Sequence, residues 1–257
     1  MERKTMQKYS GGDYHEFIKN IEKNLGEIDP TDGLYRLNYM HLGTELKLFA
    51  IGHHLSNLQR IFTETNAGSA EGQNRVRCEF DAILYSGKCV LDKLSQEAKI
   101  LFEYPEEERK IDFDVASRKK DIVGQYFGGI KALQWYKIFN EYRNTSTHRN
   151  VPIFTLSIQL GGYSDPYKKV LDDAFTIISE EEFIREWEKI SKIFLRKDGS
   201  GLSFHLRENP SDLSSERPAE DITIELVSFS LISKLIIEEV AKQTYKKFQK
   251  HISETTQ

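Results

Sequence analysis

Apolar residues recur at helical spacing along three long stretches of the chain. Leucine, isoleucine, valine and phenylalanine return there every three to four positions, which is the period of an amphipathic α-helix. The three stretches are residues 31–64, 74–102 and 219–253. A further helix is predicted from about Ser117 to residue 142, with a weak point at Gly128 and Gly129. Four long helices around one core favour a mainly α helical bundle.

The pattern changes after residue 150, where apolar and polar residues begin to alternate. The alternating apolar positions are Phe154, Leu156, Ile158 and Leu160. A period of two indicates a β-strand. Residues 199–207 fit a turn and a second short strand, and residues 209–218 have the polar, proline-containing composition of an exposed loop. We therefore expect a small mixed α/β elaboration over residues 153–218.

A short helix is predicted over residues 179–194. Ser179 is followed three positions later by Glu182, which is the spacing of a capping box at a helix N-terminus. The sequence has no internal repeat and no low-complexity tract that would divide it. We therefore expect a single helical domain over residues 1–257, with residues 1–28 as its N-terminal segment.

Composition places the chain among ordinary folded proteins. Of its 257 residues, 39% are hydrophobic and 30% are charged, so it has enough apolar side chains to bury a substantial core. The formal net charge is −4, whereas a nucleic-acid-binding protein typically carries a net positive charge. A local basic patch remains compatible with this value, because acidic residues elsewhere can mask it.

Cysteine use and hydropathy favour a cytoplasmic location. Cys78 and Cys89 are the two cysteines, and on one helix they would lie ~16 Å apart, beyond the reach of a disulfide bond. Unpaired thiols are typical of a reducing compartment. Residues 1–13 lack the apolar core of a secretory signal, and the apolar stretch 226–237 is too short to span a membrane. No spacing suggests a zinc site, so we expect no metal and no cofactor.

One short segment carries residues that suit chemistry on RNA. Arg143 and Asn144 are followed, after three further residues, by His148. RNA brings its own nucleophile, the 2′-hydroxyl group, so its cleavage requires a base, an acid and positive charge near the phosphate. Histidine serves as acid or base near neutral pH, and arginine offers a planar cation that matches phosphate. This reaction requires no metal.

The same arginine-to-histidine spacing occurs once more, between Arg36 and His41. Leu37 follows that arginine in place of asparagine, and the pair lies inside a predicted apolar helix. Residues five apart on a helix point ~140° apart, so these two side chains cannot converge on one phosphate. Arg143 and His148 instead flank threonine and serine residues that favour helix ends. We expect the chain to leave its helix there and to aim both groups at one place.

The segment from Arg143 to His148 resembles the R-N-x-x-x-H signature of HEPN ribonucleases. The long helix with internal acidic residues that precedes it, and the aromatic helix that delivers it, are also similar to that family. The resemblance implies a HEPN-like helical bundle and a metal-independent endoribonuclease with Arg143, Asn144 and His148 as catalytic residues. Arg149 and Glu79 are expected to bind the substrate.

The resemblance also implies partners and a setting. HEPN enzymes form a composite active site from two motifs that meet across a dimer, so we expect a symmetric homodimer in which two His148 residues face one another. The family occurs in toxin–antitoxin modules and phage defence, where an antitoxin or a regulatory protein is a further partner. Asn150 stands where some HEPN toxins carry a tyrosine that a partner enzyme modifies, so that form of control is not expected.

Two other interpretations of the chain stay open. Residues 143–150 also fit a polar connection between a helix and a strand, with His148 capping the helix. The protein would then be a non-catalytic dimer that binds nucleotide, RNA or protein, or an interaction protein with a helical surface. His53 and His54 are adjacent on a helix and face different directions, so a shared metal ion is not expected there.

Overall fold

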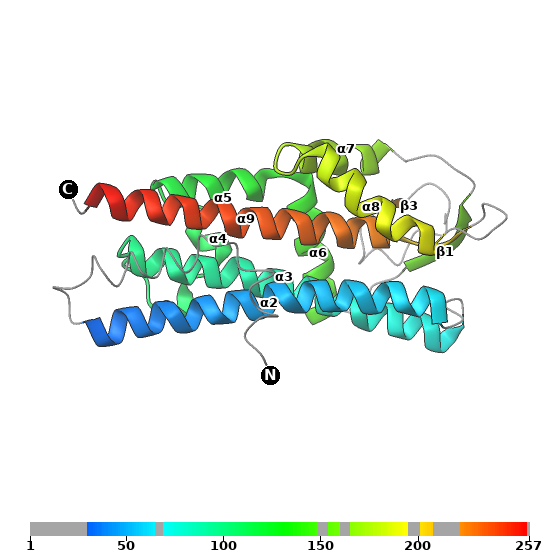
Figure 1. The fold of residues 1–257 in the computed structure, drawn as a ribbon, viewed down its shortest axis with the longest axis horizontal. Coiled ribbons are helices and arrows are strands. Elements are labelled where there is room, and N and C mark those ends of the chain that lie inside the picture. The colour runs from blue at the N-terminus through cyan, green and yellow to red at the C-terminus, as the bar shows by residue number, and fades with distance from the viewer. Residues whose placement is uncertain are drawn as a thin grey trace. The chain divides into compact units, whose positions relative to one another are not determined.

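The computed structural model describes residues 30–64, 69–148, 154–159, 165–194, 201–207 and 222–255, and these are mainly helical (Figure 1). The helices are α2 (Pro30–Glu64), α3 (Ala70–Leu101), the short 3-10 helix η2 (Glu108–Lys110), α4 (Phe113–Ala116), α5 (Ile122–Ala132), α6 (Gln134–His148), α7 (Asp165–Phe175), α8 (Glu180–Phe194) and α9 (Leu226–Thr255). None of these helices is long and apolar enough to cross a membrane.

Three strands form one antiparallel sheet in the order β1-β2-β3. They are β1 (Phe154–Gln159), β2 (Gly201–Arg207) and β3 (Ile222–Glu225). Phe154 pairs with Leu206, and Ile158 pairs with Leu202, so β1 coincides with the alternating pattern of the sequence. The pairing of β2 with β3 is irregular between Leu206 and Arg207.

The chain divides into two compact units, and the boundary falls within α2, α3 and α9. Unit 1 comprises Met1–Phe49, Lys88–Lys131 and Ile237–Gln257, and unit 2 comprises Ala50–Gly87 and Ala132–Ile236. The expectation of a single domain stays a prediction. The expected N-terminal segment, residues 1–28, and the expected loop, residues 209–218, lie outside the described residues.

Several helix boundaries follow from tertiary contacts that the sequence pattern does not reveal. The helix expected from Ser117 is divided, and α6 begins at Gln134 rather than continuing from α5. The Asp173 carboxylate of α7 accepts a hydrogen bond from the Gln134 amide, which satisfies one of the open donors of a new helix. The predicted weak point is wrong, because Gly128 and Gly129 lie inside α5.

Capping side chains determine where α8 and α9 begin. The Ser179 hydroxyl accepts a hydrogen bond of 3.1 Å from the Glu182 amide, so the predicted start of α8 is confirmed. The last helix begins at Leu226 rather than at residue 219, because the residues before it pair with β2. Glu225 ends that strand and accepts hydrogen bonds from the amides of Val227 and Ser228, which caps α9. Helix α7 was not predicted.

A buried polar cluster lies in the core of unit 1. The Glu97 carboxylate of α3 is fully buried and accepts hydrogen bonds from Thr44 Oγ1 (2.9 Å) and the Tyr245 hydroxyl (3.3 Å). His41 of α2 is also buried, with Nδ1 3.8 Å from Glu97 and Nε2 3.5 Å from Glu45. Burial alone would lower the pKa of His41, but the two carboxylates outweigh it and raise the pKa above 6.5.

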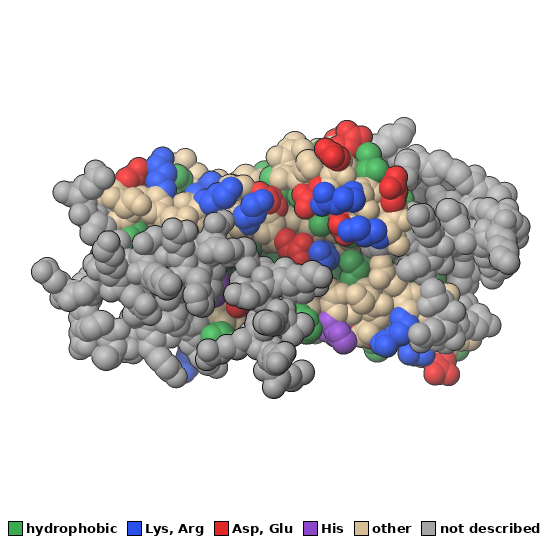
Figure 2. All heavy atoms as spheres, in the orientation of Figure 1, with side chains coloured by type: hydrophobic (Ala, Val, Ile, Leu, Met, Phe, Trp, Pro, Cys, Tyr) green, Lys and Arg blue, Asp and Glu red, His purple; other side chains and the backbone are tan. Residues whose placement is uncertain are grey.

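Among the described residues, the face that Figure 2 shows carries no large field of one sign. Basic and acidic side chains intermix there over α8 and α9. Ion pairs on α8 are part of this pattern, since Lys189 Nζ lies 2.6 Å from Glu186. This arrangement agrees with a formal net charge of −4, and any anion-binding site has to be sought in local groups of side chains.

Candidate functional site on helix α6

Helix α6 is fixed in unit 2 by a row of large aromatic side chains. Trp135 is fully buried, and its indole Nε1 donates a hydrogen bond of 2.9 Å to Ser233 Oγ on α9. Tyr142 is fully buried against Phe80 of α3, with ring centroids 5.9 Å apart in an edge-to-face arrangement. Phe80 in turn contacts Phe229 of α9. Burial of several aromatic rings at helical spacing determines which face of α6 turns inward.

The motif continues this helix instead of leaving it. Helix α6 extends to His148, so the expected departure of the chain at Arg143 is wrong. Tertiary contacts hold the polar segment helical: Thr145 is fully buried, and Ser146 forms a side-chain hydrogen bond with Asp81 of α3. Serine and threonine favour helix ends only where no such contacts oppose that tendency. On one chain, therefore, positions 143 and 148 point ~140° apart.

A hydrogen bond with Asn144 brings the Arg143 guanidinium closer to the side of α6 that carries position 148. Arg143 Nη1 donates a hydrogen bond of 3.1 Å to Asn144 Oδ1, and both side chains are half-buried. Positions 144 and 148 lie one turn apart and only ~40° apart around the helix. The Arg143 guanidinium is thus drawn toward the side of α6 that also carries position 148. The side chain of His148 and the whole of Arg149 lie outside the described residues.

Asp81 of α3 adjoins the motif segment, and the charge of Arg77 acts on Asp81 from the same helix. Asp81 forms the hydrogen bond with Ser146, and Arg77 stands one helical turn before Asp81. Burial raises the pKa of Asp81, and the hydrogen bond from Ser146 and the charge of Arg77 offset part of this effect. Neither residue was predicted to belong to the site. Their spacing of four residues was the available signal.

Glu79, expected to bind the substrate, faces a different helix. Its carboxylate Oε2 lies 2.7 Å from His54 Nδ1, and Asn57 Nδ2 lies 3.3 Å from each carboxylate oxygen. His54 and Asn57 both belong to α2. Residues two positions apart on a helix point ~200° apart, so Asp81 faces α6 while Glu79 faces α2. The structure therefore does not bring Glu79 to the motif segment.

The residue types on α6 suit phosphate binding and proton transfer. The Arg143 guanidinium is a permanent cation with several directed donors, and histidine, the residue type at position 148, is able to give or take a proton. Among the described residues, no three histidine, cysteine, aspartate or glutamate side chains gather as a potential metal site. Comparisons with protein-family models, curated proteins and solved structures found no match to the chain.

Proposed function

We propose that this protein is a metal-independent endoribonuclease of HEPN type. The observation that carries the proposal is the hydrogen bond from Arg143 Nη1 to Asn144 Oδ1, on a helix that carries His148 one turn further on. This contact draws a cation toward the side of the helix that carries the histidine. It gives Asn144 a physical role that the motif spacing alone does not supply.

The proposed reaction uses the 2′-hydroxyl of RNA as the nucleophile. The hydroxyl oxygen attacks the adjacent phosphorus, and the bond from phosphorus to the 5′-oxygen of the next nucleotide breaks. One histidine takes the 2′-proton and a second gives a proton to the departing 5′-oxygen. Arg143 stabilises the additional negative charge of the pentacoordinate phosphorus. The products are a 2′,3′-cyclic phosphate end and a 5′-hydroxyl end.

A symmetric homodimer would supply the second histidine. One chain contributes a single histidine to its motif, whereas the reaction uses a base and an acid together. A two-fold axis brings the same residue of two copies together, so two His148 side chains would form one composite site. We place this enzyme in the cytoplasm, in a toxin–antitoxin or phage-defence system with an antitoxin or regulatory protein as partner.

The second candidate function is a non-catalytic dimer that binds nucleotide, RNA or a protein through the same surface. The observation that favours it is the helical conformation of the whole motif, which separates positions 143 and 148 by ~140° on one chain. Such a helix presents cationic and polar groups for binding without bringing a catalytic pair together in a monomer.

The deciding experiment compares the purified protein with His148→Ala on total RNA and transfer RNA in EDTA. We expect cleavage that leaves 2′,3′-cyclic phosphate ends, and a loss of about 100-fold or more in the variant, as for removal of a general acid or base. The matched control is Lys137→Ala, an exposed position on the same helix. Analytical ultracentrifugation of all three proteins tests the dimer.

Each other outcome has a defined meaning. If neither protein cleaves any of several RNAs, the binding function replaces the enzymatic one. If cleavage depends on added metal and persists in His148→Ala, the active site lies elsewhere. If the protein is a monomer and is active, the composite site is wrong.

A further inference from the structure

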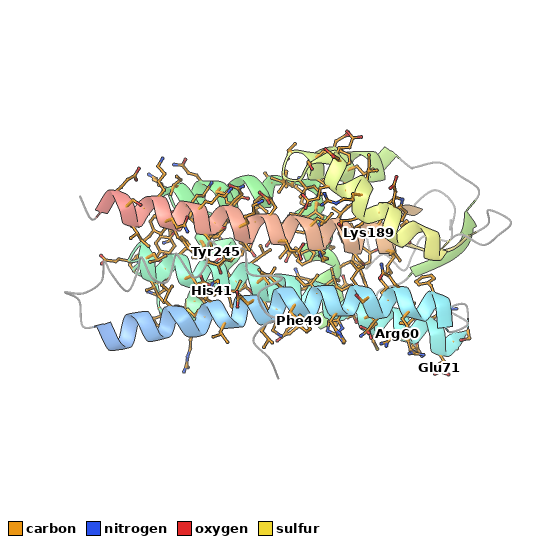
Figure 3. The ribbon with its side chains drawn as sticks, in the orientation of Figure 1. His41, Phe49, Arg60, Glu71, Lys189 and Tyr245 are labelled. Atoms are coloured by element: carbon orange, nitrogen blue, oxygen red, sulfur yellow. The ribbon has the colours of Figure 1, made fainter. Side chains whose placement is uncertain are left out.

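A second group of polar side chains lies in unit 2, on the face of α3 that is turned away from α6. It comprises His53, His54, Asn57 and Arg60 of α2 together with Glu79 of α3, and we call it the α2–α3 cluster. Figure 2 shows histidine and basic side chains at the surface over the later turns of α2, and Figure 3 labels Arg60 there.

Glu79 orients the central histidine of this cluster. Its carboxylate lies 2.7 Å from His54 Nδ1, and the exposed fractions of the two side chains are 28% for His54 and 23% for Glu79. A carboxylate at Nδ1 determines the ring orientation and places a proton on that nitrogen. Nε2 is the remaining polar atom of the ring, and it is the atom able to contact a ligand.

Asn57 links this pair to two exposed side chains of α2. Its Nδ2 lies 3.2 Å from His53 Nε2, and its Oδ1 accepts a hydrogen bond of 2.5 Å from Arg60 Nη2. The same amide nitrogen reaches the Glu79 carboxylate. One amide therefore holds an imidazole and a guanidinium in position, although both side chains are exposed.

The dimensions of the cluster suit a chain of phosphates. His54 and Arg60 are six positions apart, which is ~9 Å along the axis of α2, and the hydrogen bond from Arg60 to Asn57 draws the guanidinium toward the side of the helix that carries His54. This distance exceeds the size of a single phosphate group. The Glu79 carboxylate is hydrogen-bonded to His54 and Asn57, and the side chains of His53 and Arg60 are exposed. Arginine and histidine together are typical ligands of phosphate oxygens.

We propose that the α2–α3 cluster is a phosphate-binding site, with His54 and Arg60 as the main ligands and Glu79 and Asn57 as positioning residues. Resting on the proposed ribonuclease function, its ligand is the backbone of single-stranded RNA. The same chemistry would recognise the phosphates of a nucleotide. The site is separate from the motif on α6, because Glu79 and Asp81 leave α3 in opposite directions.

The test is fluorescence anisotropy with a labelled single-stranded 2′-O-methyl oligonucleotide, which binds but lacks the nucleophile for cleavage. We expect Arg60→Ala to weaken binding about 10-fold, the effect of a lost charged hydrogen bond, and to reduce the salt-dependence slope by about 0.7. His54→Gln should weaken binding by a smaller factor. Lys189→Ala, an exposed basic residue of α8 in the same unit, should bind like the wild type. Circular dichroism confirms that each variant is folded.

The outcomes separate this site from the proposed function. Displacement of the oligonucleotide by ATP at an equal phosphate concentration assigns the site to nucleotides, and resistance to ATP assigns it to the strand. The proposal is overturned if the wild type does not bind, if Arg60→Ala and His54→Gln bind normally, or if Lys189→Ala loses as much affinity. Weaker binding in Arg60→Ala, alongside cleavage that is indifferent to His148→Ala, would leave the phosphate site standing and remove the proposed enzyme.

Discussion

Two arginine–histidine pairs with the same spacing lie in the two units of this protein. Arg36 and His41 belong to α2 in unit 1, and Arg143 and His148 belong to α6 in unit 2. Both pairs lie within helices, so backbone conformation does not distinguish them. What differs is the surroundings that tertiary packing gives to each.

The histidine of unit 1 belongs to the core. His41 lies against Tyr245 of α9, with ring centroids 4.8 Å apart, and between two carboxylates (Figure 3). The arginine of unit 2 is half-buried and bonded to a neutral amide. The buried His41 imidazole is closed to ligands, whereas the half-buried Arg143 side chain is partly accessible to solvent. The comparison teaches that spacing does not determine the chemistry of such a pair.

The largest expected effect is on catalysis through Arg143. Arg143→Ala should reduce the rate of RNA cleavage about 100- to 1000-fold, because one donor to the transition-state charge is lost. Arg143→Lys should restore little, since an ammonium group lacks the planar fork. Initial rates on transfer RNA in EDTA measure both. Arg185→Ala, an exposed arginine of α8, is the control, and an equal loss in that variant would contradict the assignment.

The next effect is on stability through His41. At pH 5.5, below the raised pKa of His41, His41→Ala should lower the free energy of unfolding by about 3–5 kcal/mol, because it leaves the buried Glu97 carboxylate without its cationic neighbour. Urea denaturation followed by circular dichroism measures the change. Leu42→Ala is the matched control, since Leu42 is the next residue and is 57% exposed. A loss under 1 kcal/mol in His41→Ala would place His41 outside the stabilising core.

A smaller expected effect is the pH dependence of stability that His41 causes. The folded-state pKa of His41 is raised above 6.5, so the stability that its protonated form contributes is fully present below pH 6.5. That contribution is lost as the pH rises through the raised pKa. The melting temperature of the wild type should therefore fall over this range. His41→Gln should show a flatter profile, and identical slopes would exclude His41 as the source.

The smallest effect concerns Asp81. Burial raises its pKa, so its contribution to stability is greatest below the pKa of the unfolded chain and is lost as the pH rises through the folded-state pKa. Asp81→Asn keeps an acceptor for the Ser146 hydroxyl and removes the charge. We expect it to stabilise the protein by about 0.5 kcal/mol at neutral pH. The difference should vanish in acid, and a destabilised variant would show that the ionised form is required.

Much of the helical framework was predictable from local pattern. The apolar spacing placed α2 and α3 to within a few residues, and the capping residue Ser179 marked the start of α8. These features depend on neighbours within a turn, which the sequence displays directly. The division between α5 and α6 was not predictable, because it depends on Asp173, far along the chain.

The candidate sites, like the helices, have some features that were predictable from the sequence and others that were not. The sequence by itself determined which residue types stand at Arg143, Asn144 and His148, and so the chemistry that they can perform. Only the tertiary structure decided that Glu79 meets His54 on α2, that Asp81 meets Ser146 on α6, and that His41 lies between two carboxylates. The physical reason is that residue types and helical spacing are local properties, whereas burial, partner and charge environment arise from packing between segments distant in sequence.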